Sequence, residues 1–198
     1  GKNALVTRDG DSRVSVLAID NGKVEYTKRD MRSGIQPYHI TMNPSGENAV
    51  IGNNGRGGFG DIDTINVVDL RRKPYRVVET VSVDQWVEGV VFSPDGRHVA
   101  VVAMGGSNRP RNYPFYTDAG KLVMFRLDGI KLTRIADALI GHWSQGVVFS
   151  PDGRTLLVGN MVEKNLGVYR FDGASLTDTG QRIAVRGGAA ALRTAGMR

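Results

Sequence analysis

A nine-residue segment occurs twice without change in this chain. Residues 89–97 and residues 146–154 both read Gly-Val-Val-Phe-Ser-Pro-Asp-Gly-Arg. A degenerate copy, His-Ile-Thr-Met-Asn-Pro-Ser-Gly-Glu, occupies residues 39–47, and a worn copy, Ala-Ala-Ala-Leu-Arg-Thr, occupies residues 189–194. Equivalent positions of successive copies are 50, 57 and 43 residues apart. A period of this size is typical of propeller blades, so the repeat constrains the fold more than any other feature.

Each repeat can be interpreted as four β-strands. Residues 146–149 are short and apolar, as expected of an inner strand covered on both faces. Residues 150–153, Ser-Pro-Asp-Gly, predict a tight turn, because Pro fixes φ, Asp bonds nearby backbone and Gly adopts positive φ. Two further apolar strands and an Asp-Gly hairpin turn at residues 172–173 complete the unit. The sequence therefore predicts an all-β fold, a β-propeller of four-stranded antiparallel blades.

The repeats divide the chain into about four blades of a single domain. Gly1-Lys2 aligns with Gly96-Arg97, so the chain begins with the second strand of its first blade. We expect residues 189–194 to supply the missing inner strand, because propellers close their ring in this way. Either four blades close the ring, or the chain is the C-terminal part of a longer ring. The abrupt start favours the longer ring. The expected blades are residues 1–34 with 189–194, 35–85, 86–141 and 142–188.

Composition excludes several classes of function. The chain has no cysteine, which rules out a disulfide scaffold, a thiolate metal site and a cysteine nucleophile. It has no apolar run near the roughly 20 residues of a membrane span. The net charge is +6, but Lys and Arg are scattered, so we expect no nucleic-acid partner. The lack of cysteine fits export and cytoplasm alike, and our expectation leans to the periplasm or secretion from a bacterium.

The turns and the residues before them resemble a known family. Ser-Pro-Asp-Gly-Arg turns between apolar strands are similar to YVTN-type repeats. The detail is closest to the lactonase-like seven-bladed propellers, which include 6-phosphogluconolactonase-type and muconate-cycloisomerase-type enzymes. That family carries Gly-Pro-Arg-His before its turn proline and an Asn-Glu pair after the second strand. Here residues 36–39 read Gln-Pro-Tyr-His, and Asn53-Asn54 occupy the place of the pair. The histidine is kept, whereas Tyr38 replaces arginine and Asn54 replaces glutamate.

The resemblance covers nearly the whole chain and implies an activity. It implies that the chain is the C-terminal portion of a seven-bladed ring that hydrolyses a sugar or organic-acid lactone. His39 would be the catalytic acid or base, or it would merely bond neighbouring strands. The implied substrate-binding residues are Tyr38, Asn53, Asn54 and, in a later blade, Asn160. The alternative is a non-catalytic propeller module that binds a protein, a glycan or a small ligand, since the repeats are shared by many non-enzymes.

Strand order predicts where a site would lie, whatever the family. Loops joining the second strand to the third, and the fourth to the next first, emerge on one face around the channel mouth. Two of these loops are expanded: the glycine-rich residues 53–61 and residues 105–118. In the second, Arg109, Arg111 and Tyr113 would form a wall that holds a carboxylate or phosphate. The loop could instead pack on a neighbouring blade. His142 should approach the same rim, for binding or for packing.

No cofactor is expected. The three histidines are scattered and have no spaced carboxylate, which argues against a transition-metal site. Asp61 and Asp63 with Asn54 offer oxygen ligands for Ca²⁺, but their spacing fits no calcium loop. The expected partners are a small lactone, or a protein or glycan ligand. Missing blades or a second chain would complete the ring.

Overall fold

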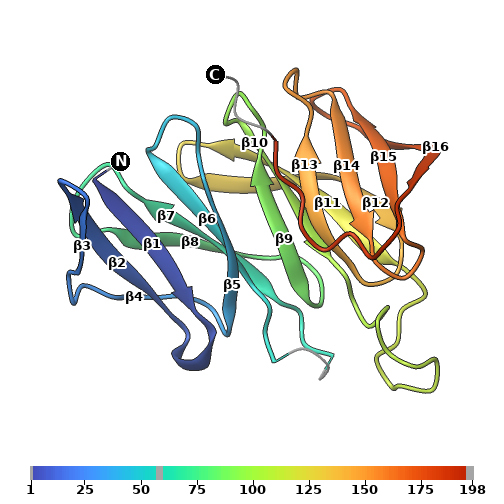
Figure 1. Cartoon of the computed structure of the whole chain (residues 1–198), viewed down its shortest axis with the longest axis horizontal. Coiled ribbons are helices and arrows are strands. Elements are labelled where there is room, and N and C mark those ends of the chain that lie inside the picture. Colours follow the sequence, from blue (N-terminus) through green and yellow to red (C-terminus); the bar gives the residue numbers. More distant parts are fainter. Residues whose placement is uncertain (1, 57–59, 195–198) are drawn as a thin grey trace.

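The computed structural model describes residues 2–56 and 60–194 and is built almost entirely of β-strands (Figure 1). A short 3-10 helix, Asp9–Asp11, is the one helical element of the described residues, so no helix there is long enough to cross a membrane. The strands are β1 (Asn3–Arg8), β2 (Arg13–Asp20), β3 (Lys23–Tyr26), β4 (Met31–Arg32), β5 (Pro37–Met42), β6 (Asn48–Asn53), β7 (Thr64–Asp69), β8 (Arg76–Ser82), β9 (Val87–Phe92), β10 (His98–Ala103), β11 (Gly120–Asp128), β12 (Lys131–Ile140), β13 (Ser144–Phe149), β14 (Thr155–Asn160), β15 (Asn165–Phe171) and β16 (Leu176–Ala184).

These strands form four antiparallel four-stranded sheets, which we call blades 1 to 4 in chain order. Blades 2, 3 and 4 run β5-β6-β7-β8, β9-β10-β11-β12 and β13-β14-β15-β16 without a crossover. In blade 1 the order is β1-β2-β3, and β4 also pairs with β2. The predicted all-β propeller of four-stranded blades is confirmed.

The repeated turns have the geometry that their residues predict. In blade 3, Asp95 Oδ1 accepts the N–H of Arg97 at 3.0 Å, and Ser93 Oγ accepts the N–H of His98 at 2.9 Å. Gly96 has φ of 70° and its N–H reaches the carbonyl of Ser93 at 2.9 Å. The turn at residues 150–153 repeats these bonds residue for residue. The turns therefore fix the register between the inner and second strands in blades 3 and 4.

The apolar core lies between blades. β1 packs against β5, β5 against β9, and β9 against β13. One cluster fills each interface: blades 1 and 2 share Val14, Met31 and Ile51, blades 2 and 3 share Ile65, Val101 and Phe125, and blades 3 and 4 share Met124, Leu156 and Tyr169. Each blade thus buries its faces only against its neighbours in the series, which is the packing expected of a repeat protein.

A glycine marks the closest approach of one inner strand to the next. A Cβ built on Gly89 of β9 would lie 2.3 Å from the carbonyl oxygen of Gln145 in β13 of blade 4. Gly146 occupies the equivalent position in β13, and a Cβ there would lie 2.9 Å from the main-chain nitrogen of Leu192. The main chain of a following segment therefore passes directly over this repeat position in both blades.

The C-terminal segment differs from our expectation. Residues 189–194 form no strand and are not part of the sheet of blade 1, which consists of β1 to β4. Their main chain lies against Gly146 and Gly159 of blade 4, where the inner strand of a following blade would pass. Figure 1 shows blades 1 and 4 at opposite ends of the molecule, so a closed ring of four blades does not form. Within the described residues the segment reaches as far as blade 2, where Arg193 contacts His39, and it does not pair with β1.

Alanine at Gly89 should be strongly destabilising. The added methyl would clash with the carbonyl of Gln145, and main chain cannot move aside as a side chain can. We expect Gly89→Ala to lower the free energy of unfolding in urea by about 1–3 kcal/mol. Gly10→Ala is the control, because nothing lies within 4 Å of its Cβ position, and it should change stability by less than about 0.5 kcal/mol. Equal stability of the two variants would contradict the proposed main-chain contact.

Candidate functional site

The long connections gather on one face, as strand order predicts. Figure 1 shows the β6–β7 and β10–β11 connections leaving the side opposite the Ser-Pro-Asp-Gly turns. Three residues at one repeat position of this face, Gln36, Trp86 and Trp143, have positive φ of 52°, 64° and 50°. The carbonyls of Gln36 and Trp86 accept the N–H groups of Asn54 and Met104 at 2.9 and 3.0 Å. These bonds hold the entry of β5 to the exit of β6 and the entry of β9 to the exit of β10.

His39 lies on β5 with both ring nitrogens engaged. Its Nδ1 is 2.8 Å from the main-chain carbonyl oxygen of Glu88, and its Nε2 is 3.0 Å from Nη2 of Arg193. A carbonyl only accepts and a guanidinium only donates. Nδ1 therefore carries the proton, and Nε2 presents its lone pair. Both contacts select this neutral tautomer, whose Nε2 is a proton acceptor.

Repeat alignment explains the position of His39. It stands where blades 3 and 4 have Gly89 and Gly146, five residues before the turn proline. Glu88 and Gln145 are equivalent in the same way. The carbonyl of Gln145 crosses over Gly89, while the carbonyl of Glu88 receives the Nδ1–H of His39. His39 thus occupies the repeat position at which blades 3 and 4 have glycine. Its side chain forms a hydrogen bond with the main-chain carbonyl of Glu88, which belongs to the inner strand of the next blade.

The Glu88 carboxyl is a site residue that we did not predict. Its side chain is buried, with the residue 6% exposed, and Asn54 Nδ2 donates to its Oε1 at 3.0 Å. Burial raises the pKa of Glu88, and the bond from Asn54 opposes part of that rise. The signal was a charged residue within an apolar inner strand. Arg193 was also missed, because it lies in the worn repeat copy, where nothing in the sequence marks it.

Tyr38 flanks His39 on the open side. The residue is 55% exposed, and its ring meets the imidazole edge-on with centroids 6.4 Å apart. Its carbonyl accepts the hydroxyl of Thr7 at 3.0 Å, which links blade 2 to β1. His39, Tyr38, Asn54, Glu88 and Arg193 therefore form one group, which we call the His39 cluster.

Asn53 and Asn160 are almost fully buried. Each residue is 1% exposed. Asn53 Nδ2 donates to the carbonyl of Thr64 at 3.1 Å, and Asn160 Oδ1 accepts the N–H of Gly141 at 3.1 Å. Both side chains join the entry of the inner strand to the third strand of the blade. These bonds give both side chains a structural role in this arrangement.

The arginines of the β10–β11 connection are held by aromatic rings. The guanidinium of Arg109 lies 4.6 Å from the ring centroid of Trp86 and 5.5 Å from that of Tyr113. Arg111 lies 5.6 Å from the centroid of Tyr116 and forms a 3.0 Å ion pair with Asp118. Arg109 and Tyr113 thus meet beside the start of β9, while Arg111 is turned toward blade 4.

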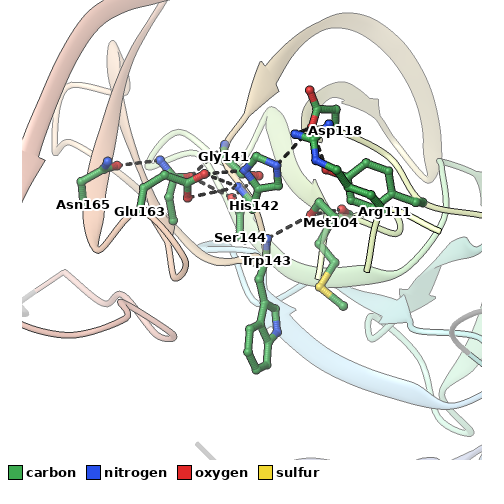
Figure 2. A network of polar contacts seen from close by, with 12 residues as sticks. Met104, Arg111, Asp118, Gly141, His142, Trp143, Ser144, Glu163 and Asn165 are labelled. Carbon is green, nitrogen blue, oxygen red and sulfur yellow. Dashed lines mark hydrogen bonds and ion pairs between the residues drawn. The ribbon is translucent and has the colours of Figure 1, made fainter. Parts of the chain in front are cut away.

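His142 belongs to a second polar network, shown in Figure 2. Its Nδ1 lies 2.6 Å from Glu163 Oε1, and its Nε2 lies 3.6 Å from Asp118 Oδ1. Burial raises the pKa of Glu163, yet the bonds from the N–H and ring of His142 outweigh it, so the pKa is lowered. The N–H of Trp143 also donates to Ser107 Oγ at 2.9 Å. The β10–β11 connection is therefore fastened to blade 4, which is the packing alternative we had left open.

A cavity of about 710 Å³ opens on the same face beside blade 2. Its lining includes Asn53, Arg56, Asp61 and Asp63 but not His39. Burial raises the pKa of Asp63 to about 6, the N–H of Trp86 at 2.6 Å opposes the rise, and the charge of Asp61 adds to it. Within the described residues no group of three or more His, Asp and Glu is arranged to hold a metal ion. Part of the glycine-rich loop, residues 57–59, lies outside the described residues.

Comparison with solved structures identifies the fold. The sequence matches no defined protein family and no curated protein. Two structures of provisionally assigned 6-phosphogluconolactonases are similar. The one from Bacteroides fragilis is 21% identical, with a TM-score of 0.77 over 95% of this chain and 53% of its own. The one from Bacteroides uniformis is 17% identical, with a TM-score of 0.78 and the same coverage. The β-propeller domain of Cps50 (Swd1) from Myceliophteria thermophila has a TM-score of 0.65 at 13% identity, over 96% of this chain and 58% of its own.

These likenesses define the class of protein. The chain is a β-propeller protein whose blades are arranged as in these solved structures. It spans about half the length of the two bacterial structures. At these identities the likeness shows the fold alone.

Removing the Asn160 side chain should lower the free energy of unfolding, because it weakens blade 4. Asn160→Ala leaves the N–H of Gly141 and the amide oxygen of Asn165 without their partner in a buried place. We expect a loss of about 2–3 kcal/mol in urea unfolding. Asn112→Ala, at an exposed place in the β10–β11 connection, is the control and should stay within about 0.5 kcal/mol of wild type. A wild-type stability for Asn160→Ala would argue against the structural role.

Asp63 should make stability fall as pH rises. Because the pKa of Asp63 is raised to about 6 in the fold, the folded state binds its proton more tightly than the unfolded chain. Its stabilising effect is complete below about pH 4 and is lost as pH rises to about 7. Asp63→Asn keeps an acceptor for Trp86 and removes this loss. The variant should gain on the order of 1 kcal/mol over wild type between pH 4 and 7, allowing for the solvent screening of a half-buried group. Urea unfolding of both proteins at pH 4 and at pH 7 tests this. The prediction is wrong if the difference in free energy of unfolding between Asp63→Asn and wild type is the same at the two pH values.

Proposed function

We propose that this protein is a lactonase-like hydrolase that opens a sugar or organic-acid lactone at the His39 cluster. The observation that carries the proposal is the tautomer of His39. Nδ1–H is held by the carbonyl of Glu88, so Nε2 is left as an acceptor near the start of β5. A neutral imidazole in this state is suited to general-base chemistry near neutral pH.

The reaction needs one proton acceptor that later returns the proton. Nε2 of His39 would remove a proton from a water molecule as the water oxygen bonds to the lactone carbonyl carbon. When the bond between that carbon and the ring oxygen breaks, the ring oxygen would take the proton back from Nε2. The product is the open hydroxy acid, and atoms balance without a cofactor. Glu88 would position the base through its carbonyl.

The departures from the family pattern have counterparts in the His39 cluster. Asn54 replaces the family's glutamate, yet its amide bonds the carboxyl of Glu88 from the next blade. A carboxyl thus lies next to this position even though the sequence lacks one there. Tyr38 replaces the family's arginine, and Arg193 brings a guanidinium to the same imidazole. These contacts support a lactonase site rearranged among blades.

The four blades would work within a longer ring. Blades 1 and 4 lie at opposite ends of the molecule, and β1 has its sheet partner, β2, on one side only. Further blades or a second chain would complete the ring and enclose the His39 cluster. The half-length coverage of the Bacteroides structures supports this proposal.

A second candidate function is ligand binding without catalysis. It is favoured by the stacking of Arg109 between Trp86 and Tyr113 on the same face. Aromatic rings and arginines are enriched at recognition surfaces. In this case the connection β10–β11 would contact a protein, a glycan or a small ligand.

Turnover of lactones by His39 variants tests the first proposal. The substrates are glucono-δ-lactone, its 6-phosphate and a γ-lactone of an organic acid, with acid release followed in a weakly buffered solution. His39→Asn keeps a side-chain N–H for the Glu88 carbonyl but has no basic nitrogen. We expect kcat to fall by about 10²–10⁴-fold.

The control for this experiment is His98→Ala. His98 lies on the opposite face beside a turn, where its ring meets Phe171, and its loss should leave turnover within about twofold once folding is verified by circular dichroism. Wild-type turnover in His39→Asn would exclude the role of His39. If no lactone is opened by the wild-type protein, the binding module is the better account.

A further inference from the structure

The proposed base is blocked in the structure. Nε2 of His39 accepts a hydrogen bond from Arg193 at 3.0 Å, so its lone pair is not available to a water molecule. Arg193 comes from the segment after β16, and 154 residues separate the two partners in the sequence. Either the hydrogen bond between Arg193 and His39 is a permanent structural contact, or it breaks during function.

The segment that carries Arg193 is seated on blade 4. A Cβ on Gly159 of β14 would lie 2.2 Å from the carbonyl oxygen of Ala189, and Gly146 meets the main chain of Leu192. Figure 1 shows this segment passing in front of β13. The main chain of β13 packs over Gly89 of blade 3 in the same way. The contact of residues 189–192 with blade 4 therefore repeats the packing between successive blades. Arg193 is therefore presented from a defined backbone.

The guanidinium of Arg193 forms no ion pair with any described residue. Among the residues that the structure describes, its contacts are the carbonyl of Leu192 at 2.9 Å and the imidazole of His39. Arg193 is exposed. By contrast Arg111 is paired with Asp118, and Arg109 is stacked on two aromatic rings. Arg193 thus differs from Arg109 and Arg111 in having a partner that is easily exchanged.

We propose that Arg193 is an anion-binding residue that caps His39 until a carboxylate or phosphate group draws its guanidinium away. A carboxylate or phosphate carries a negative charge and can accept two parallel N–H bonds from a guanidinium, whereas the neutral imidazole offers a single uncharged acceptor, so an oxyanion outcompetes it. Binding of the anion exposes Nε2 next to the bound molecule. In its catalytic consequence the proposal rests on the proposed function, and it narrows the substrate to lactones that carry an anionic group. The anion site itself does not depend on lactone hydrolysis.

Binding of inorganic phosphate and of acetate tests the anion site. Each anion is titrated into the protein and followed by amide chemical shifts in NMR spectra. We expect Arg193→Ala to weaken binding at least tenfold, whereas Arg186→Ala, in the same segment but without a contact to His39, leaves it unchanged. His39→Ala should bind at least as tightly as wild type, because the competing acceptor is gone. Wild-type affinity in Arg193→Ala, or a tenfold loss in His39→Ala, would overturn the proposal.

Chemical modification tests the cap without any substrate. Diethyl pyrocarbonate acylates an accessible imidazole nitrogen, and the extent at each of the three histidines can be read from peptide masses. We expect His39 to react at least fivefold faster in Arg193→Ala than in wild type, with His98 unchanged. Gly159→Ala should have the same effect, since its methyl displaces Ala189 and with it Arg193. Equal rates at His39 in wild type and Arg193→Ala would show that no cap exists.

The outcomes separate this proposal from the proposed function. Loss of anion binding and faster modification in Arg193→Ala, together with no lactone turnover by wild type, would uphold the anion site and reject the lactonase. Turnover that depends on His39 but not on Arg193, with equal affinity for neutral and anionic lactones, would uphold the lactonase and reject the cap.

Discussion

The contact on which the rest of the structure depends is the crossing of one inner strand over the next. At Gly89 and Gly146 there is no room for a side chain, because main chain of the following segment passes within van der Waals distance. This contact sets the spacing of the blades, and with it the depth of the apolar clusters between them. It also brings residues from different repeats together on one face. His39 from blade 2, Glu88 from blade 3 and Arg193 from beyond blade 4 meet for this reason.

Polar groups on this face fall into two kinds. Asn53 and Asn160 are buried and bonded within their own blades, so changing them costs stability. The bonds of Arg193 and His39 join separate segments and can be exchanged for bonds to a ligand at little cost. Function is expected in the second kind, since a group that holds the fold together is not free to change partners. His142 lies between them, because it links the β10–β11 connection to blade 4 through charged partners.

The sequence predicted the fold well because the fold is carried by local chemistry that repeats. Each Ser-Pro-Asp-Gly turn specifies its own bonds, and the apolar strands on either side need only pack against the next copy. The placement of residues 189–194 was not predictable in the same way. Alignment showed that they form an inner-strand copy, but whether this copy reaches blade 1 depends on the curvature summed over four blades. Similarly, Arg109 and Arg111 were expected to hold a carboxylate or phosphate, with packing of their loop on a neighbouring blade as the alternative. The sequence does not show that Trp86 and Asp118 engage them.

The position of His39 shows how a repeat can acquire a site. The crossing requires that the carbonyl of the following blade come close to this position, and in blades 3 and 4 glycine allows it. A larger residue is tolerated only if it makes a favourable contact with that carbonyl, and an N–H donor does so. Histidine meets this demand with Nδ1 and still has a second nitrogen to spare. The close approach of the next blade's carbonyl thus excludes most side chains at this position. In His39 the same contact selects the tautomer with the proton on Nδ1. Nε2 then points away from the Glu88 carbonyl and accepts a hydrogen bond from Arg193. A histidine in a copy of the motif whose other members have glycine is consequently a stronger indication of a site than its isolated occurrence suggests.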